Sequence, residues 1–274
     1  MHPVLIKIGW FNIYSFGFML AVSFLVGIYM STRRAKTFGV DPQYILDLSV
    51  YIILAGVIGS RLLYVVFHLD EYRSLVDVFA LWQGGATLYG GFLLSIFVIY
   101  VFTKKRNLDY LLVADIVSPA LALGIMLTRV GCFLSGCCYG KPTELAWGVV
   151  FPPDSAAGVY ARQIAASYPV EAVALHPTQL YASFFGMVTL LFLLLFRNKL
   201  TKRGSTFGAL LMLYGTFRFT LDFFRFYEGN MRVLLDLSLN QWISLGMFGV
   251  GLFFVLRRTN VKTVPVALSQ SGQK

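Results

Sequence analysis

The sequence predicts an all-α polytopic membrane protein with seven transmembrane helices, on the basis of its composition, its apolar runs and the placement of its basic residues. Of the 274 residues, 57% are hydrophobic and only 13% are charged, which lies outside the usual range of soluble domains. Lys and Arg outnumber Asp and Glu by 23 to 13. Because these basic residues come in short clusters between apolar runs, we expect them to set membrane topology and not to bind nucleic acid.

Seven runs are apolar over the roughly 20 residues that a helix needs to cross a bilayer. They cover residues 12–32, 45–67, 86–103, 110–135, 178–196, 206–227 and 237–256. The first run has no cleavage site of small residues, and more runs follow it, so we expect a retained helix and not a removed signal peptide. The sequence therefore predicts one transmembrane domain over residues 1–258 and a flexible cytoplasmic tail over residues 259–274.

Basic residues follow the first, third, fifth and seventh runs, whereas the intervening loops hold few of them. The basic residues after these four runs are Arg33, Arg34, Lys36, Lys104, Lys105, Arg106, Arg197, Lys199, Lys202, Arg203, Arg257, Arg258 and Lys262. Since Lys and Arg favour cytoplasmic loops, we expect the N-terminus outside and the C-terminus in the cytoplasm. The longest loop, at about 141–176, is then expected on the outer face.

The stretch LTRVGCFLSGCCYGK, residues 127–141, places an arginine, all three cysteines and three glycines where a membrane segment should leave the bilayer. An arginine at that depth costs roughly 2.5–3.5 kcal/mol on insertion scales. Residues 121–130 contain no acid that could pair with Arg129. Gly131, Gly136 and Gly140 allow backbone or a ligand to come close. We therefore expect this stretch to form the floor of a lipid-facing active site.

Three further arginines share the expected level of Arg129, near the outer ends of the second and sixth runs. They are Arg61, Arg218 and Arg225. Guanidinium groups stay charged and match the geometry of phosphate, so several at one level predict an anion site. A phospholipid head group is the expected anion at that depth. The alternative is that the four arginines extend separately to the membrane interface.

Asp222, His176 and two tyrosines are further candidates, each with an ordinary alternative. Asp222 lies four residues after Arg218, so the two share a helix face and a purely structural ion pair is equally compatible with the spacing. His176 opens HPTQLY, a pattern typical of a helix start, where a histidine is often a cap. Tyr14 and Tyr89 are also compatible with an interfacial aromatic belt.

The cysteines Cys132, Cys137 and Cys138 allow three interpretations. They are small packing residues or local site residues, an oxidisable pair on the outer face, or a metal site. We favour them in that order. Zinc is not expected, because three cysteines without a nearby histidine match no common zinc spacing, and no other cofactor is expected.

The chain resembles the prolipoprotein diacylglyceryl transferase family from Tyr14 to about Gln241. The segments that carry the resemblance are GSRLLYVVF from Gly59, LWQGG and YGG between Leu81 and Gly91, TRVGCFLSGCCYG from Thr128, WGVVFP from Trp147, HPTQLY from His176, YGTFRFTLDFFR from Tyr214 and LSLNQWISL from Leu237. Each is weak by itself. Their order and spacing on seven expected spans make the resemblance specific.

The resemblance implies a multi-pass enzyme of the bacterial inner membrane that acts among membrane lipids. It would move the diacylglyceryl group of phosphatidylglycerol onto the lipobox cysteine of preprolipoprotein signal peptides and release glycerol phosphate. Arg129 and Arg218 would hold the phosphate, and Asp222 would take the place of a family glutamate. The other positions expected to contact substrate are Tyr14, Arg61, Gly90, Gly91, Cys132, Cys137, Gly140 and Arg225.

Several positions depart from the family pattern. Tyr89 replaces the histidine of an HGG motif, which is a favoured candidate for activating the incoming thiol. Cys132 and Cys137 replace an asparagine and a glutamate, Gln83 replaces an acid, and Ala182 replaces a glutamate. Besides Tyr89, His176 and Asp222 are then the candidate bases. Two other hypotheses are a membrane thiol oxidoreductase using the three cysteines and a non-catalytic lipid-binding or transport protein.

Overall fold

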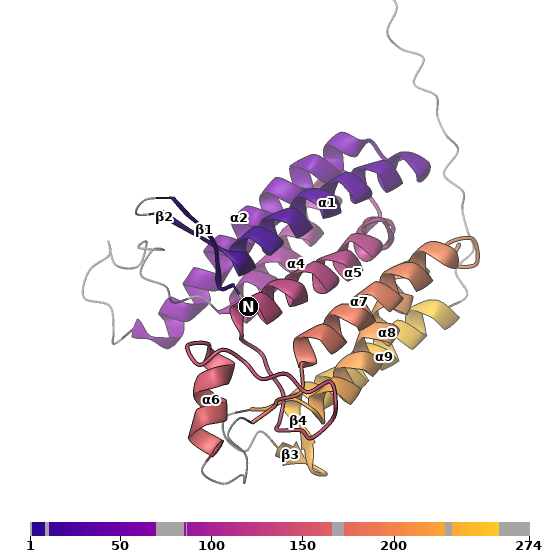
Figure 1. Cartoon of the computed structure of the whole chain (residues 1–274). Helices are drawn as coiled ribbons and strands as arrows, with labels where there is room; N and C mark the ends of the chain where they lie inside the picture. Colours follow the sequence, from indigo (N-terminus) through magenta and orange to yellow (C-terminus); the bar gives the residue numbers. More distant parts are fainter. Residues whose placement is uncertain are drawn as a thin grey trace, which may run out of the picture. The chain divides into compact units, whose positions relative to one another are not determined.

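The computed structural model describes residues 2–8, 11–69, 85, 87–165, 173–227 and 232–257 (Figure 1). Most of these residues are helical. The helices are α1 (Ser15–Thr37), α2 (Pro42–Phe67), α4 (Leu88–Lys105), α5 (Tyr110–Ser135), α6 (Ala156–Ala165), α7 (Thr178–Leu195), α8 (Ser205–Asp222) and α9 (Leu239–Leu256). Each of the seven predicted apolar runs overlaps one of the long helices, and α6 lies in the long loop before α7.

Five helices in the described part of the chain are long and apolar enough to cross a membrane. They are α1, α2, α5, α7 and α9. Their side chains are mostly exposed to the surroundings, with only 17–39% of each spanning window buried inside the protein. Apolar helices that leave so much of their surface uncovered are suited to a lipid environment. The chain is therefore a polytopic helical membrane protein.

Two small antiparallel sheets accompany the helices, which the prediction of an all-α fold missed. Strand β1 (Val4–Ile8) pairs with β2 (Phe11–Tyr14), and β3 (Arg232–Leu234) pairs with β4 (Leu237–Ser238). The predicted first run began at residue 12, but α1 begins only at Ser15. Residues 11–14 contain aromatic and β-branched side chains that favour the extended conformation, and Tyr14 pairs with Val4 in the sheet.

The sixth predicted run was also too long, because α8 ends at Asp222 and not at residue 227. The residues that follow leave the helix, and Arg225 forms an isolated antiparallel bridge with Gly140. Lys141 donates its backbone N–H to the carbonyl of Phe224 at 2.9 Å. The backbone after α8 is thus hydrogen-bonded to the long loop, a pairing between distant segments that hydrophobicity cannot reveal.

The chain forms two compact units, whose boundaries fall within α1 and α5. Among the described residues, one unit comprises residues 31–116, and the other comprises residues 2–30 and 117–257. The predicted tail, residues 259–274, lies outside the described residues, as does Gln83.

In the unit that contains residues 31–116, α2 and α4 approach each other through glycines. A Cβ atom on Gly90 would lie 2.1 Å from the carbonyl oxygen of Gly59, and one on Gly91 would lie 2.7 Å from that of Gly56. Small residues are the usual means by which membrane helices pack closely. The double glycine after Tyr89 therefore has a packing role in this fold.

In the other unit, α5, α7, α8 and α9 pack through small residues in the same way. A Cβ atom on Gly186 of α7 would lie 2.8 Å from the backbone nitrogen of Met126 in α5. A Cβ atom on Gly208 of α8 would lie 2.7 Å from the carbonyl oxygen of Gly251 in α9. These contacts join α5 to α7 and α8 to α9, and three of these helices, α5, α7 and α8, surround the candidate site.

Candidate functional site

A cavity in the unit that contains α7, α8 and α9 is lined by α5, α7 and α8. The space between its walls is about 420 Å³, and part of that space is open to the surroundings. Two of its lining residues are the arginines Arg129 and Arg218. The others are Ile125, Ala182, Phe185, Gly186, Thr189, Tyr214, Phe217 and Leu221. The two arginines from separate helices, α5 and α8, therefore share one cavity whose remaining walls are mostly apolar.

The guanidinium of Arg218 is held by two partners. Its Nη1 donates to Oδ1 of Asp222 at 2.9 Å, and its Nη2 donates to the hydroxyl of Tyr227 at 2.6 Å. The side chains of Arg218 and Asp222 are only 15% and 3% exposed. The ion pair expected from their spacing is confirmed, and burial makes it a tightly held pair rather than a surface contact.

Asp222 is itself anchored from the segment that precedes α9. The hydroxyls of Tyr227 and Ser238 donate to Oδ1 and Oδ2 of its carboxylate. Burial raises the pKa of the Tyr227 phenol, so the hydroxyl keeps the proton that it donates. Ser238 also caps α9 through a reciprocal pair of hydrogen bonds with Gln241. Both oxygens of Asp222 are thus occupied, and the network positions Arg218.

Arg129 differs from Arg218 because no hydrogen bond or ion pair holds it within the described residues. It lies in the last two turns of α5 and is partly exposed. In the cavity, Arg129 and Arg218 contribute two positive charges, and Asp222 offsets one of them. The local charge of about +1 complements an anion with a single negative charge, such as a phosphodiester.

The C-terminal end of α5 turns sharply into the cysteine segment. Gly136 adopts a left-handed conformation, with φ of 68°, and its N–H bonds the carbonyl of Phe133 at 3.1 Å. The N–H of Cys137 bonds the carbonyl of Cys132 at 3.2 Å. These two bonds form the common glycine-dependent helix end. The glycine after Ser135 is therefore required by the turn, and it returns Cys137 toward Cys132.

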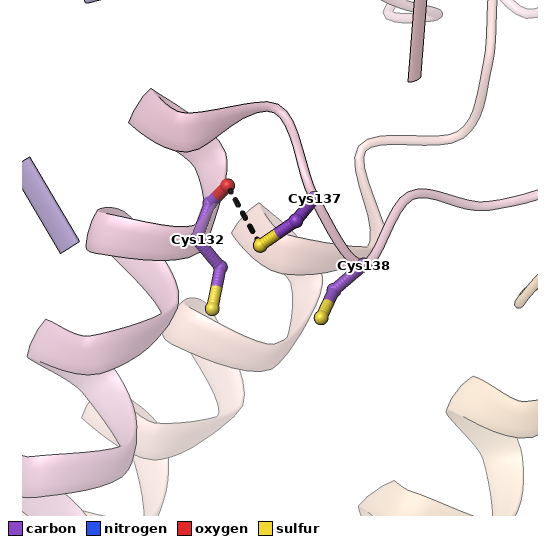
Figure 2. A group of neighbouring side chains, drawn as sticks. All are labelled: Cys132, Cys137 and Cys138. Atoms are coloured by element: carbon purple, nitrogen blue, oxygen red, sulfur yellow. Dashed lines mark hydrogen bonds between the residues drawn. The ribbon is translucent and has the colours of Figure 1, made fainter. Parts of the chain in front are cut away.

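The three cysteines come together at this turn (Figure 2). Their sulfur atoms all lie within 4.8 Å of one another, and no disulfide joins them. The thiol of Cys137 donates a hydrogen bond to the backbone carbonyl of Cys132 at 3.7 Å. The pKa of Cys138 is lowered, first by the neighbouring thiols of Cys132 and Cys137 and then by the positive charges of Arg225 and Arg129, which favour the thiolate. The sequence left open whether these cysteines meet, and the structure shows that they do.

Gly140 and His176 lie side by side where the long loop returns to α7. The N–H of Gly140 donates to the carbonyl of His176 at 3.0 Å, and the N–H of His176 donates to the carbonyl of Lys141 at 3.0 Å. Nδ1 of His176 lies 3.1 Å from the hydroxyl of Tyr181. Its ring also meets that of Phe224 edge to face, with centroids 5.2 Å apart. His176 is therefore fixed in place, although it does not line the cavity.

We expect the substitution Gly140→Ala to destabilise this junction, because an added Cβ would lie 2.6 Å from both the Cβ of His176 and the carbonyl oxygen of Phe224. Overpacking of this kind typically costs about 1–3 kcal/mol. The thermal unfolding temperature of the detergent-solubilised protein should fall. Gly246→Ala is the matched control, since its Cβ would meet nothing within 4 Å. An equal change in both variants would contradict the packing role of Gly140.

The remaining predicted site residues are placed as follows. Arg61 does not extend outward but is buried at 5% exposure, and its Nη1 donates to the carbonyl of Gly85 at 3.0 Å. Arg225 lies over the ring of Tyr227, with 5.5 Å between its guanidinium carbon and the ring centroid. Tyr14 and Tyr89 are 59% and 62% exposed. Arg61 and Tyr89 belong to the unit that does not contain the cavity.

Several residues of the site were not anticipated from the sequence. Tyr214, Phe185 and Phe217 line the cavity, and the rings of the last two stack at 4.0 Å. Ser238 was not anticipated either, although the pattern Ser-x-x-Gln that ends at Gln241 is a known helix-start signal and could have located the cap. No comparable signal marks the aromatic residues, because aromatic residues are frequent throughout the chain.

The fold and the site define a helical membrane protein with a cavity that is cationic and mostly apolar. The sequence model of the family described as "Prolipoprotein diacylglyceryl transferase" matches residues 3–257. Phosphatidylglycerol–prolipoprotein diacylglyceryl transferases from several bacteria are similar along nearly their whole length. The protein from Clostridium tetani is 32% identical over 92% of this chain and 96% of its own. The protein from Bordetella parapertussis is 31% identical over 94% of this chain and 96% of its own length. The protein from Cupriavidus metallidurans is 32% identical over 95% of this chain and 96% of its own length.

These similarities show that the chain belongs to the prolipoprotein diacylglyceryl transferase family. The resemblance seen in the motifs is thereby confirmed. The relatives' names describe a transferase and not a thiol oxidoreductase or a lipid carrier, so they support the first of the three hypotheses on function.

Proposed function

We propose that this chain transfers the diacylglyceryl group of phosphatidylglycerol to the thiol of a lipobox cysteine in preprolipoproteins and releases glycerol phosphate. The names of its relatives support this reaction. The observation on which the proposal rests is the cavity that Arg129 and Arg218 share, because two guanidinium groups among apolar walls suit a lipid that carries one phosphate.

In the proposed reaction, the sulfur of the incoming cysteine attacks the glyceryl carbon that is bonded to the phosphate oxygen. A C–S bond forms, the C–O bond breaks, and the electron pair leaves with glycerol phosphate. The developing negative charge on the phosphate is stabilised by Arg129 and Arg218, which are already in place before reaction. The proton of the thiol passes to a base.

His176 is the proposed base for that proton. Asp222 is unsuited to this role, because Arg218, Tyr227 and Ser238 occupy both of its oxygens. The hydroxyl of Tyr181 already accepts a hydrogen bond from Nε1 of Trp147 at 2.8 Å. It can accept a second from Nδ1–H of His176, which leaves Nε2 free to accept a proton.

The pH dependence of transfer tests this role. Burial lowers the pKa of His176 from its ordinary value of 6.5, and the positive charge of Lys141 lowers it further. The imidazole is therefore neutral at pH 7, and kcat/KM should fall only as the pH drops through that lowered pKa. We expect His176→Gln to reduce kcat/KM by about 10²- to 10⁴-fold and to remove this acid limb. An unchanged acid limb in the variant would rule out His176 as the base.

We further propose that all seven long helices cross the bacterial inner membrane, with the N-terminus outside and the C-terminus in the cytoplasm. The basic residues at the C-terminal ends of α1 and α4, and those that follow α7 and α9, support this orientation. It would place the cysteine segment, the long loop and the cavity end of α5 near the outer leaflet. Accessibility of single engineered cysteines in a variant without the three native ones would test it.

The reaction itself is tested with purified protein in detergent, phosphatidylglycerol and a synthetic lipobox peptide. The proposal predicts release of glycerol phosphate and a mass increase of the peptide by one diacylglyceryl group. A peptide with serine in place of the lipobox cysteine should give neither product. If the authentic peptide remains unmodified while an enzyme of a relative modifies it in parallel, the proposed function is wrong.

A further inference from the structure

The chain's three cysteines form a cluster, which Figure 2 shows. This cluster is separate from the lining of the cavity. Their sulfur atoms lie within 4.8 Å of one another, and all three are free thiols. Cys132 is buried, whereas Cys137 and Cys138 are partly exposed, so the cluster can be reached from outside. None of the three lines the cavity that contains Arg129. The cluster therefore presents three sulfur ligands to one small volume.

Hydrogen bonds hold the backbone of this cluster in place. The amide of Gln179 donates to the carbonyl of Cys137 at 2.7 Å, and the hydroxyl of Thr178 donates to the carbonyl of Cys138 at 2.8 Å. Cys138 has a φ of 61°, a left-handed conformation that is uncommon for residues other than glycine. Such a conformation is kept only where its surroundings enforce it. The three sulfur atoms are thus positioned by the fold before any ligand binds.

The geometry and number of the sulfur atoms suit a three-coordinate metal ion. Three sulfurs that each lie about 2.3 Å from one ion in a plane are about 4 Å apart, so the cluster needs to contract by less than about 1 Å. Within the described residues, no His, Asp or Glu joins the group of three. Zinc in structural sites takes four ligands, whereas thiolates without a fourth ligand favour the soft ion Cu(I).

The charges near the cluster agree with a monovalent ion. Three thiolates and one Cu(I) carry a net charge of −2. The backbone of Arg225 forms a bridge with Gly140, two residues after Cys138, so its guanidinium offsets part of that charge. We propose that Cys132, Cys137 and Cys138 bind one Cu(I) ion through three thiolate sulfurs. This goes beyond the transfer reaction and does not depend on it.

The test is a titration of the full-length, reduced protein in detergent with Cu(I), without oxygen and in competition with a coloured Cu(I) chelator. We expect one ion per chain to be withdrawn from the chelator, and X-ray absorption to show three sulfurs at about 2.3 Å. If the wild-type protein withdraws no copper, or if nitrogen and oxygen dominate the coordination, the proposal is overturned. This readout is independent of transferase activity.

Two variants identify the ligands. Cys138→Ser should weaken Cu(I) binding by at least about 100-fold. Residues that only hydrogen-bond a metal ligand already contribute about 10- to 100-fold to metal affinity, and a direct ligand contributes more. Met19→Leu is the control, because it removes a different sulfur ligand close to Cys132. The Cβ of Met19 would lie 3.0 Å from a Cβ added to Gly131, the residue before Cys132. This variant should bind Cu(I) as tightly as wild type does. Equal losses in the two variants would overturn the assignment to three thiolates. Thermal unfolding of both variants verifies that they are folded.

Discussion

Replacing Arg129 with Gln is expected to lower kcat/KM for diacylglyceryl transfer by about 10²- to 10³-fold, the usual cost of removing one group that stabilises developing negative charge. Arg129 lines the cavity, and no partner holds its guanidinium within the described residues, so its charge is available to the substrate. The measurement is the rate at which purified enzyme releases glycerol phosphate from phosphatidylglycerol in the presence of a lipobox peptide.

Arg257→Gln is the control for this loss, because it makes the same chemical change at an exposed residue just after α9. Its rate should stay within about twofold of wild type, since surface substitutions away from special features have small effects. Arg129→Lys should recover only part of the rate, because an ammonium group cannot form the two parallel hydrogen bonds of a guanidinium. Wild-type rates in Arg129→Gln would remove Arg129 from the mechanism.

Asp222→Asn is expected to have the largest effect on stability, at about 3–5 kcal/mol of the free energy of unfolding. The substitution leaves the buried guanidinium of Arg218 without its counter-charge, and losing one partner of a buried ion pair typically costs this much. It also disturbs the hydroxyl donors Tyr227 and Ser238, which need an acceptor. Thermal or denaturant unfolding of the purified protein measures the loss.

The matched control is Asp47→Asn, which makes the same change in a looser pair. Asp47 lies 3.9 Å from Arg106, and the two side chains are 32% and 49% exposed. Exposed pairs of this kind contribute about 0–1 kcal/mol, so this variant should unfold almost as wild type does. If Asp222→Asn is no less stable than Asp47→Asn, the buried ion pair of Arg218 with Asp222 does not contribute the expected stability.

The positions of the helices could be predicted from the sequence, because long apolar runs and basic clusters are local signals. Each of the seven runs overlaps a long helix. The pairing of Arg218 with Asp222 followed from their spacing of four residues. The ends of the runs were less predictable. Tyr14 lies in a strand, and the chain beyond Asp222 leaves the helix, because both segments form hydrogen bonds with residues that apolarity does not reveal.

The site was predictable only in part, for the same reason. That Arg129 lacks an acidic neighbour could be seen in the sequence, whereas the cavity that it shares with Arg218 depends on the packing of α5 against α7 and α8. The meeting of Cys132 with Cys137 and Cys138 depends on the turn at Gly136, which spacing alone does not determine. Contacts of this kind arise from tertiary structure and leave little trace in one sequence.

The most direct test of the account is a comparison of how the protein binds phosphatidylglycerol and a diacylglycerol with the same acyl chains, which lacks the phosphate. If Arg129 and Arg218 hold the lipid phosphate, wild type should bind phosphatidylglycerol at least about 10-fold more tightly, a difference of about 1.4 kcal/mol. Arg129→Gln should lose most of that preference. Equal binding of the two lipids by wild type, or an undiminished preference in the variant, would contradict the assignment of this cavity to the lipid phosphate.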